Sequence, residues 1–329
     1  MNDSKCIKFS IIIPVYDRKD YVRKAVNSCL IQEYSRDNIE IIVVKNFLDD
    51  HLEEWLRGQS VLYINSDKVN LVDKLIEGIN ISNNDVICLL EDDDEFVIDK
   101  LKILNKYYKK FSDIACLHNN FRYMEEKGYK IDNFYLKHMK KLERVILLQD
   151  DDEKFSLIKN KDIYHNLSSW SFRRDYGYKL LKDLAGLTYD IDFLIYVQVI
   201  ENRWRLLLLP DKLTIYRRHG STTRIAVEDE KIINLFEYSI FSLRTIEYKL
   251  TNKKLRHFIM SSIDIEQFKI NIIEEKFPKI TDINKSIKIL IYPPFMNNEL
   301  YPFLFLYLIL GVFKRFRKHL YVNKAYILN

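Results

Sequence analysis

Residues 85–96, with the sequence DVICLLEDDDEF, join a short apolar run directly to five acidic residues. An apolar run of this length, bounded by polar residues, predicts a buried β-strand whose carboxyl end carries the acids. Open α/β sheets bind their ligands at that edge. Several carboxylates in one turn repel one another unless a cation lies among them, so the stretch predicts a divalent ion held by oxygen ligands. A solvated acidic turn is the alternative, and the elements on either side argue against it.

Strand and helix patterns alternate around this stretch. Residues 9–16 (FSIIIPVY) and 39–44 (IEIIVV) have the β-branched composition of buried parallel strands, and a short strand is predicted at 61–64. Apolar residues at helical spacing occupy the segments between them, 18–33, 50–57 and 69–79. This order predicts an α/β fold with a Rossmann-like, mostly parallel sheet flanked by helices. The ends of the first, second and fourth strands should then share one edge.

Composition and charge exclude several classes of protein. The 329 residues are 47% hydrophobic and 13% aromatic, which is ample for a globular core. The chain has no glycine-rich phosphate-binding motif, and its four cysteines lack the CxxC spacing of zinc sites. The net charge of +5 is matched by the five basic residues that follow residue 300, where no acid occurs. A chain-wide nucleic-acid surface is therefore not expected.

Three segments occur in a characteristic order: SIIIPVYDRKDYVRKAVNSCLIQEY at 10–34, IEIIVV at 39–44 and GINISNNDVICLLEDDDEFVIDKL at 78–101. Together they resemble the N-terminal half of family 2 glycosyltransferases of the GT-A fold. The resemblance covers residues 8–104 closely and 166–223 more loosely. It implies a GT-A-type catalytic domain at 1–225, with a donor half at 8–118 and an acceptor half at 166–223, followed by a helical region at 226–329.

The resemblance also implies a metal site in the acid cluster. The DKL sequence at 99–101 sets a register in which Glu91 takes the family's first acid position, and Asp93 binds Mg²⁺ or Mn²⁺ with Asp94 beside it. A second register would use Asp92 and Asp94 instead. The string YRRHGS at 216–221 resembles the segment whose histidine, here His219, completes the metal shell or contacts the diphosphate.

A donor-binding set follows from the same resemblance, with members at the ends of the first two strands, in the helix predicted at 69–79, in the acid cluster and in the YRRHGS string. Its members are Pro14, Tyr16, Asp17, Lys45, Asn46, Lys74, Glu91, Asp92 and Arg218. A UDP-sugar is the expected donor. The family usually has Asp-Asp-Gly-Ser after its second strand, and the first of these acids helps to recognise the base. This chain has Lys45-Asn46-Phe47-Leu48 there, so the resemblance does not fix the base.

The acceptor half contains the predicted catalytic base. Asp190, in GLTYDIDFLIY at 186–196, resembles the aspartate of the family's Glu-Asp motif, although Tyr189 replaces the glutamate. Asp192 is the alternative base, and a helix cap is the structural alternative for Asp190. Trp170 is predicted to stack on an acceptor sugar, with a packed core position as its alternative.

A second acidic run, VILLQDDDE at 145–153, repeats the pattern of a strand followed by acids. It lies outside the ordered series of strands, and no DKL-like helix start follows it. We therefore expect a solvated loop, with a rival metal site as the alternative.

The C-terminal region has two further patterns. Apolar residues between 228 and 277 keep the helical spacing of two long amphipathic helices. Residues 301–313 carry no charge and precede a basic cluster; as a helix they would be about 20 Å long, too short to span a bilayer. A segment at 301–320 is thus predicted to contact a membrane surface, with a buried helix or a subunit contact as alternatives.

These observations predict a metal-dependent, inverting glycosyltransferase that moves a sugar from a nucleotide-diphosphate sugar to an acceptor hydroxyl. Synthesis of a surface glycan or a lipid-linked glycan is the expected setting, and the expected location is the cytoplasm or the inner face of the cell membrane. Two alternatives stay open: a catalytically silent GT-A-like binding module, and a sugar nucleotidyltransferase.

Overall fold

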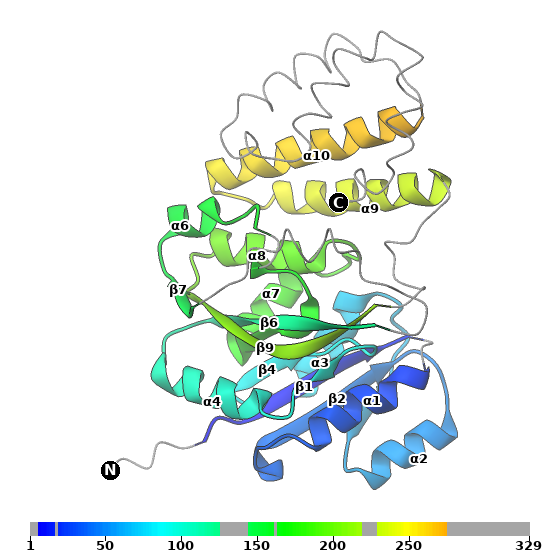
Figure 1. The fold of residues 1–329 in the computed structure, drawn as a ribbon. Coiled ribbons are helices and arrows are strands. Elements are labelled where there is room, and N and C mark those ends of the chain that lie inside the picture. The colour runs from blue at the N-terminus through cyan, green and yellow to red at the C-terminus, as the bar shows by residue number, and fades with distance from the viewer. Residues whose placement is uncertain (1–5, 17–18, 126–143, 161–162, 219–228, 275–329) are drawn as a thin grey trace. The chain divides into compact units, whose positions relative to one another are not determined.

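The computed structural model describes residues 6–16, 19–125, 144–160, 163–218 and 229–274. The chain divides into two compact units, residues 1–220 and 221–329. The described residues of the first unit form a nine-stranded sheet with the strand order β3-β2-β1-β4-β8-β6-β9-β5, and β7 pairs with β9 beside this path (Figure 1). The strands are β1 (Phe9–Val15), β2 (Ile39–Lys45), β3 (Leu62–Asn65), β4 (Val86–Leu89), β5 (Glu95–Phe96), β6 (Cys116–Glu125), β7 (Ile146–Leu148), β8 (Trp170–Arg173) and β9 (Leu206–Arg218).

The N-terminal half of the sheet is parallel, as its sequence predicts. Strand β1 pairs in parallel with β2 and with β4, and β2 pairs in parallel with β3. The helices that connect these strands are α1 (Lys19–Leu30), α2 (Asp50–Gly58) and α3 (Leu71–Ile81), and α4 (Lys100–Lys110) follows β5. Because the strands run in one direction, the carboxyl ends of β1, β2 and β4 meet at one edge of the sheet.

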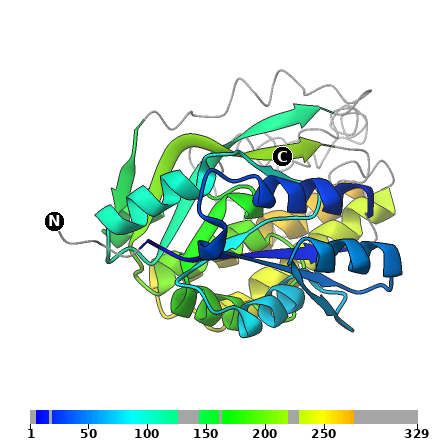
Figure 2. The ribbon, with the colours of Figure 1, turned by 90° about the horizontal axis from the view of Figure 1, so that it is seen from below.

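Helices cover both faces of this half (Figure 2). Alternate side chains of β1, such as Ile11 and Ile13, join one apolar core with residues of α1, α2 and α4. The opposite face carries Ile12, which packs against α3 at Gly78. A Cβ atom on Gly78 would lie 2.4 Å from Ile12 Cγ2, so glycine is needed for this close approach.

The second half of the sheet contains both parallel and antiparallel strand pairs. Strand β8 joins β4 in the antiparallel direction, and β6 is antiparallel to β8. Strand β9 is parallel to β6 but antiparallel to β5 and β7. The remaining described elements of the first unit are η1 (Arg36–Asn38), η3 (Leu167–Ser169), α6 (Asp151–Ser156), α7 (Arg174–Asp183) and α8 (Ile191–Glu201). The fold is therefore α/β with a mixed sheet.

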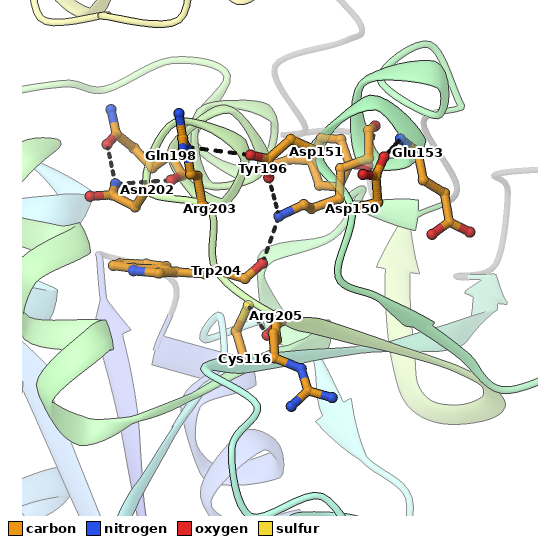
Figure 3. A network of polar contacts seen from close by, with 11 residues as sticks. Cys116, Asp150, Asp151, Glu153, Tyr196, Gln198, Asn202, Arg203, Trp204 and Arg205 are labelled. Carbon is orange, nitrogen blue, oxygen red and sulfur yellow. Dashed lines mark hydrogen bonds and ion pairs between the residues drawn. The ribbon is translucent and has the colours of Figure 1, made fainter.

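The second acidic run is not a solvated loop (Figure 3). Its apolar part forms β7 within the sheet, and its acids begin α6, where Asp150 Oδ1 accepts a hydrogen bond from Glu153 N at 2.9 Å. Asp151 lies 2.7 Å from the Nζ of Lys154, which is fully buried and donates to Trp204 O at 2.9 Å. A buried ammonium group needs such acceptors, so the acids here have structural roles.

The second unit contains α9 (Asp229–Glu247) and α10 (Lys253–Ile273), which confirms the two predicted helices. They share an apolar cluster that includes Phe236, Ile240 and Ile270. The predicted membrane segment at 301–320 lies outside the described residues. Within the part of the chain that is described, no helix is both long enough and apolar enough to cross a membrane.

Candidate active site

The acid cluster forms a loop at the carboxyl edge of the sheet. Strand β4 ends at Leu89, and the acids lead directly into β5. Leu90 N donates to Ile12 O at 3.1 Å, which keeps the start of the loop beside β1. Strand β1 has β2 on one side and β4 on the other, so the loop lies where the strand order reverses. This is the position at which open α/β sheets bind ligands.

Two acids of the loop are anchored by backbone amides of other strands. Asp92 is fully buried, and its Oδ2 accepts a hydrogen bond from Tyr16 N at 2.9 Å. Asp94 is 1% exposed, and its Oδ1 accepts from Arg217 N at 2.9 Å. Asp93 lies between these anchored neighbours and is 8% exposed. The loop thus connects the ends of β1 and β9 on either side of Asp93.

Arg217 is an organising residue of this loop that the sequence did not reveal as such. Its side chain is buried, its Nε donates to the backbone oxygen of Asp93 at 2.9 Å, and its guanidinium pairs with Glu95. The guanidinium also lies over the ring of Tyr21, 5.1 Å from the centroid. The sequence YRRHGS alone is also compatible with arginines that bind phosphate. Because β9 pairs with β5, the side chain of Arg217 lies at the acid loop instead.

Lys100, the lysine of the DKL sequence, connects the start of α4 to Ser168 and to β9. Its fully buried Nζ donates to Ser168 O at 2.8 Å and to Thr214 Oγ1 at 3.0 Å. Burial lowers the pKa of Lys100 to about 7, and nearby Cys88, Cys29 and Asp94 oppose the shift. Ser168 also contacts the acid loop directly, because its Oγ accepts a hydrogen bond from Glu91 N at 2.9 Å.

The ends of β1 and β2 require a correction. Lys45 and Lys74 were expected to contact the donor, but both side chains are fully buried. Lys45 Nζ donates to Phe47 O at 2.7 Å and pairs with Glu53 at 2.6 Å. Lys74 Nζ donates to Val15 O at 2.7 Å and to Asn46 Oδ1 at 2.9 Å. Both lysines bind protein acceptors because a buried charge must be compensated, and Asn46 is the exposed residue of the group.

The predicted bases lie at the start of α8. Asp190 is the N-cap residue but has a φ of 56° and makes no capping hydrogen bond with its side chain. A left-handed conformation is uncommon for a residue other than glycine and is frequent at functional sites. Asp192 lies in the first turn, where its Oδ2 is 3.0 Å from His165 Nδ1 and accepts from Asn166 N at 3.2 Å.

The segment around residues 165–168 connects the two halves of the site. Asn166 binds Asp192 through its backbone amide and accepts a bond from Ser168 N at 2.8 Å through its Oδ1. Ser168 then binds Glu91 through its hydroxyl. A continuous hydrogen-bonded path therefore links α8 to the acid loop, although Glu91 and Asp192 are about 100 positions apart in the sequence.

An aromatic cluster that the sequence did not predict lies beside this path. Its members are Phe121 and Tyr123 of β6, Tyr216 of β9, and His165, with ring centroids 5.4 to 5.8 Å apart. Phe121 is buried, whereas Tyr123 and Tyr216 are partly exposed. The alignment of Tyr123 with Tyr216 in parallel strands produces this pairing, which a single strand's sequence cannot show.

Trp170 also requires a correction. Its ring is fully buried, its Nε1 donates to Tyr164 O at 3.0 Å, and it stacks on Phe172 with centroids 5.6 Å apart. No part of the ring is accessible for an acceptor sugar, so the packed core position is the one observed. Pro14 is likewise buried within β1.

The side chains of three predicted residues lie outside the described part of the structure. Asp17 and His219 lie outside the described residues, and only the backbone of Arg218 is described, at the end of β9. Within the described residues, no group of three or more His, Cys, Asp or Glu side chains is arranged to hold a metal. A magnesium ion nevertheless needs only one or two carboxylates when substrate phosphates supply the other oxygens, and the acid loop offers ligands of that kind.

The parallel half-sheet, the acid loop at its reversal point and the mixed second half define a GT-A fold, the class that includes nucleotide-sugar transferases. Solved structures share it. S. aureus TarS 1–349 has a TM-score of 0.56 at 15% identity, covering 98% of this chain and 88% of that chain. The mannosyltransferase PcManGT from Pyrobaculum calidifontis, in complex with GDP-Man and Mn²⁺, has a TM-score of 0.52 at 10% identity, covering 95% and 89%. At these identities the likeness concerns the fold.

The chain belongs to glycosyl transferase family 2, because the family model matches residues 10–174, half of its length. Glycosyltransferase GlyA of Streptococcus pneumoniae is 27% identical over 126 residues, which are 37% of this chain and 18% of that protein. An uncharacterized glycosyltransferase of Rickettsia felis is 31% identical over 131 residues, 37% of this chain and 21% of that protein. The chain thus matches about a fifth of the length of these curated relatives.

Proposed function

We propose that this protein transfers a sugar from a nucleotide-diphosphate sugar to an acceptor hydroxyl, with inversion at the anomeric carbon and with the help of Mg²⁺ or Mn²⁺. The acid loop carries this proposal, because it places Asp93 between two anchored acids at the ligand-binding edge of the sheet. The family membership supports it. Structures of the same fold contain UDP-GlcNAc in TarS and GDP-Man with Mn²⁺ in PcManGT.

Asp93 is the proposed metal ligand, with Asp94 beside it and His219 as a further candidate. Asp92 and Asp94 each accept a backbone amide through a carboxylate oxygen, and the backbone oxygen of Asp93 accepts from Arg217 Nε. The register set by the DKL sequence at 99–101 is the reason for choosing Asp93 over Asp92. A bound divalent ion would neutralise the charge that develops on the leaving diphosphate.

Asp190 is the proposed general base, which would remove the proton from the acceptor hydroxyl as that oxygen attacks the anomeric carbon. Asp192 binds His165, Asn166 and, through Oδ1, the Phe193 amide at 2.8 Å, so its carboxylate is committed to positioning the start of α8. Those contacts support Asp192 as a positioning residue. Asp190 is only partly buried at the same helix start, as a base must be to reach a substrate.

The test is a thermal-shift series on the full chain with UDP-, GDP-, CDP- and dTDP-sugars, each with and without Mn²⁺. A ligand that binds the folded state raises the melting temperature by mass action, so no acceptor is needed. We expect at least one nucleotide sugar to stabilise the protein only when Mn²⁺ is present. A melting temperature that no nucleotide sugar changes, with or without metal, would contradict the proposal.

A catalytically silent binding module is the second candidate. Lys45 and Tyr189 favour it, because each stands where the family resemblance leads us to expect an acid. Slow release of free sugar from the donor identified above would separate the transferase from the silent module: an active transferase hydrolyses its donor in the absence of acceptor, and a silent module leaves it intact.

A membrane-associated acceptor is predicted only from the sequence of residues 301–320.

A further inference from the structure

One face of α9 carries a stripe of exposed aromatic side chains. Tyr238, Phe241 and Tyr248 are 56%, 60% and 81% exposed. Tyr248 directly follows the helix, and its N donates to Arg244 O at 3.4 Å, which continues the last turn. Because successive residues of an α-helix turn by about 100°, the three rings lie within a sector of about 80°. Exposed aromatic side chains gathered on one face are typical of a surface that binds another molecule.

The opposite face of α9 already has a partner. Ile232, Phe236 and Ile240 are buried in the apolar cluster that α9 shares with α10. Burial of this face accounts for the amphipathic pattern of the helix but leaves the aromatic stripe without an explanation.

Two charged residues border the aromatic stripe. Glu237 precedes Phe241 by four positions and Arg244 follows it by three, and both side chains are exposed. Seven positions apart, they lie about 20° from each other around the helix and about 10 Å from each other along it, so they share one edge of the stripe. That separation is too long for an ion pair within the helix. In the described part of the chain, no ion pair or side-chain hydrogen bond engages either group.

The arrangement is complementary to itself in the antiparallel direction. In a two-fold pair of helices centred on Phe241, a residue that precedes position 241 faces one that follows it by the same number of positions. Glu237 of one copy then lies within about 1.5 Å, measured along the axis, of the level of Arg244 in the other copy, at the same edge. Symmetry makes this pairing occur twice. A parallel pair would bring identical residues to the same level and would not match the two charges.

From these observations we propose that the chain forms a two-fold symmetric dimer in which α9 packs antiparallel against α9 of a second copy. The two Phe241 rings meet at the centre, and Tyr238 and Tyr248 extend the apolar contact on either side. Glu237 and Arg244 form the two ion pairs at its edge. Standard interfaces bury about 1,200–2,000 Å², and a contact between two single helices is small beside them, so we expect a dissociation constant in the micromolar range.

Sedimentation velocity of the full chain, at about 1 to 100 µM, measures this dissociation constant. The native chain should shift from monomer to dimer within that range. Phe241→Glu should weaken the dimer at least about 30-fold, because it brings two carboxylates together at the centre of the contact. Met260→Glu is the matched control: it adds the same charge at a side chain of α10 that is 50% exposed and lies outside the stripe. Its dissociation constant should equal the native one.

A charge exchange tests the antiparallel register. Glu237→Arg alone and Arg244→Glu alone each bring like charges together across the interface, and each should weaken the dimer about tenfold. The double variant restores opposite charges and should return the dissociation constant to within about threefold of the native value. Because all these positions are exposed, the variants should keep the native melting temperature.

The possible results decide the assignment. Loss of the dimer in Phe241→Glu, together with rescue in the double charge variant, would support it. A chain that stays monomeric over the whole range would overturn it, and binding of that monomer to phosphatidylglycerol vesicles through Phe241 would assign the stripe to a membrane surface. A dimer that survives Phe241→Glu, or charge variants without rescue, would place the contact elsewhere. None of these outcomes depends on donor binding, so the proposed function is tested separately.

Discussion

Arg217 donates from its Nε to the backbone oxygen of Asp93 at 2.9 Å, which joins two residues 124 positions apart in the chain. The backbone amide of Arg217 also binds Asp94, and the guanidinium pairs with Glu95. One residue of β9 therefore holds three consecutive acids. Asp93 is the proposed metal ligand. The position of its backbone, and therefore of its carboxylate, depends on a contact with β9, which lies near the C-terminal end of the first unit.

Replacing Arg217 by methionine should weaken metal-dependent donor binding. The change leaves the backbone oxygen of Asp93 and the carboxylate of Glu95, whose side chain is 23% exposed, without this donor, which costs about 1–3 kcal/mol. We expect a lower melting temperature, and a smaller further rise when nucleotide sugar and Mn²⁺ are added to the folded variant. Arg217→Lys should recover part of both effects. Equal Mn²⁺-dependent stabilisation in Arg217→Met and the native chain would exclude a positioning role.

The two registers of the acid loop predict opposite results at neighbouring positions. Asp93→Asn should abolish the Mn²⁺-dependent part of donor binding, because it removes the carboxylate that is proposed to hold the ion. Asp92→Ala should instead lower stability by about 1–3 kcal/mol, since the Tyr16 amide loses its acceptor. Urea unfolding and donor titrations with and without Mn²⁺ measure the two quantities. The reverse pattern would assign the metal to Asp92.

Asp190→Asn should remove transfer and preserve donor binding. General-base catalysis contributes about 10²–10⁴-fold, so transfer or donor hydrolysis should fall by that factor while the donor dissociation constant stays the same. Asp192→Asn is the matched control: it disturbs the contact with His165 at 3.0 Å and should mainly lower stability. Full activity in Asp190→Asn, with loss in Asp192→Asn, would move the base to Asp192.

The sequence predicts those parts of the fold that depend on local patterns. The strands that become β1, β2 and β4 and the helices between them follow from periodicity, and the acid loop follows from five consecutive acids. The second half of the sheet does not, because the antiparallel pairing of β8 with β4 joins segments about 85 residues apart. The apolar run at 146–148 gave no sign that β9 would pair with it.

The buried lysines explain most of the errors at the site. Lysine is normally exposed, yet Lys45, Lys74, Lys100 and Lys154 are all fully buried. Each is stabilised by carbonyl or side-chain oxygens from distant segments, such as the 2.9 Å contact of Lys154 with Trp204 O. Since those acceptors come together only after folding, the sequence pattern alone does not show that Lys45 and Lys74 are buried.

His118 should make stability depend on pH. It is buried against Trp170, and its Nε2 lies 2.9 Å from His165 O, a carbonyl that can only accept. Burial is the largest cause that lowers the pKa of His118 to about 3, from 6.5; the charges of His165 and Lys100 lower it further, whereas Asp192 and the bond to His165 oppose the shift.

Because the folded pKa is depressed, the unfolded chain binds a proton between about pH 6.5 and 3 and the folded chain does not. The contribution of His118 is therefore fully present above pH 6.5 and is lost as pH falls, by up to about 1.4 kcal/mol per pH unit. Urea unfolding at pH 5, 6, 7 and 8 should show this slope for the native chain and a flatter one for His118→Gln, which can still donate to His165 O. Equal slopes in the two proteins would show that His118 is not held neutral by burial.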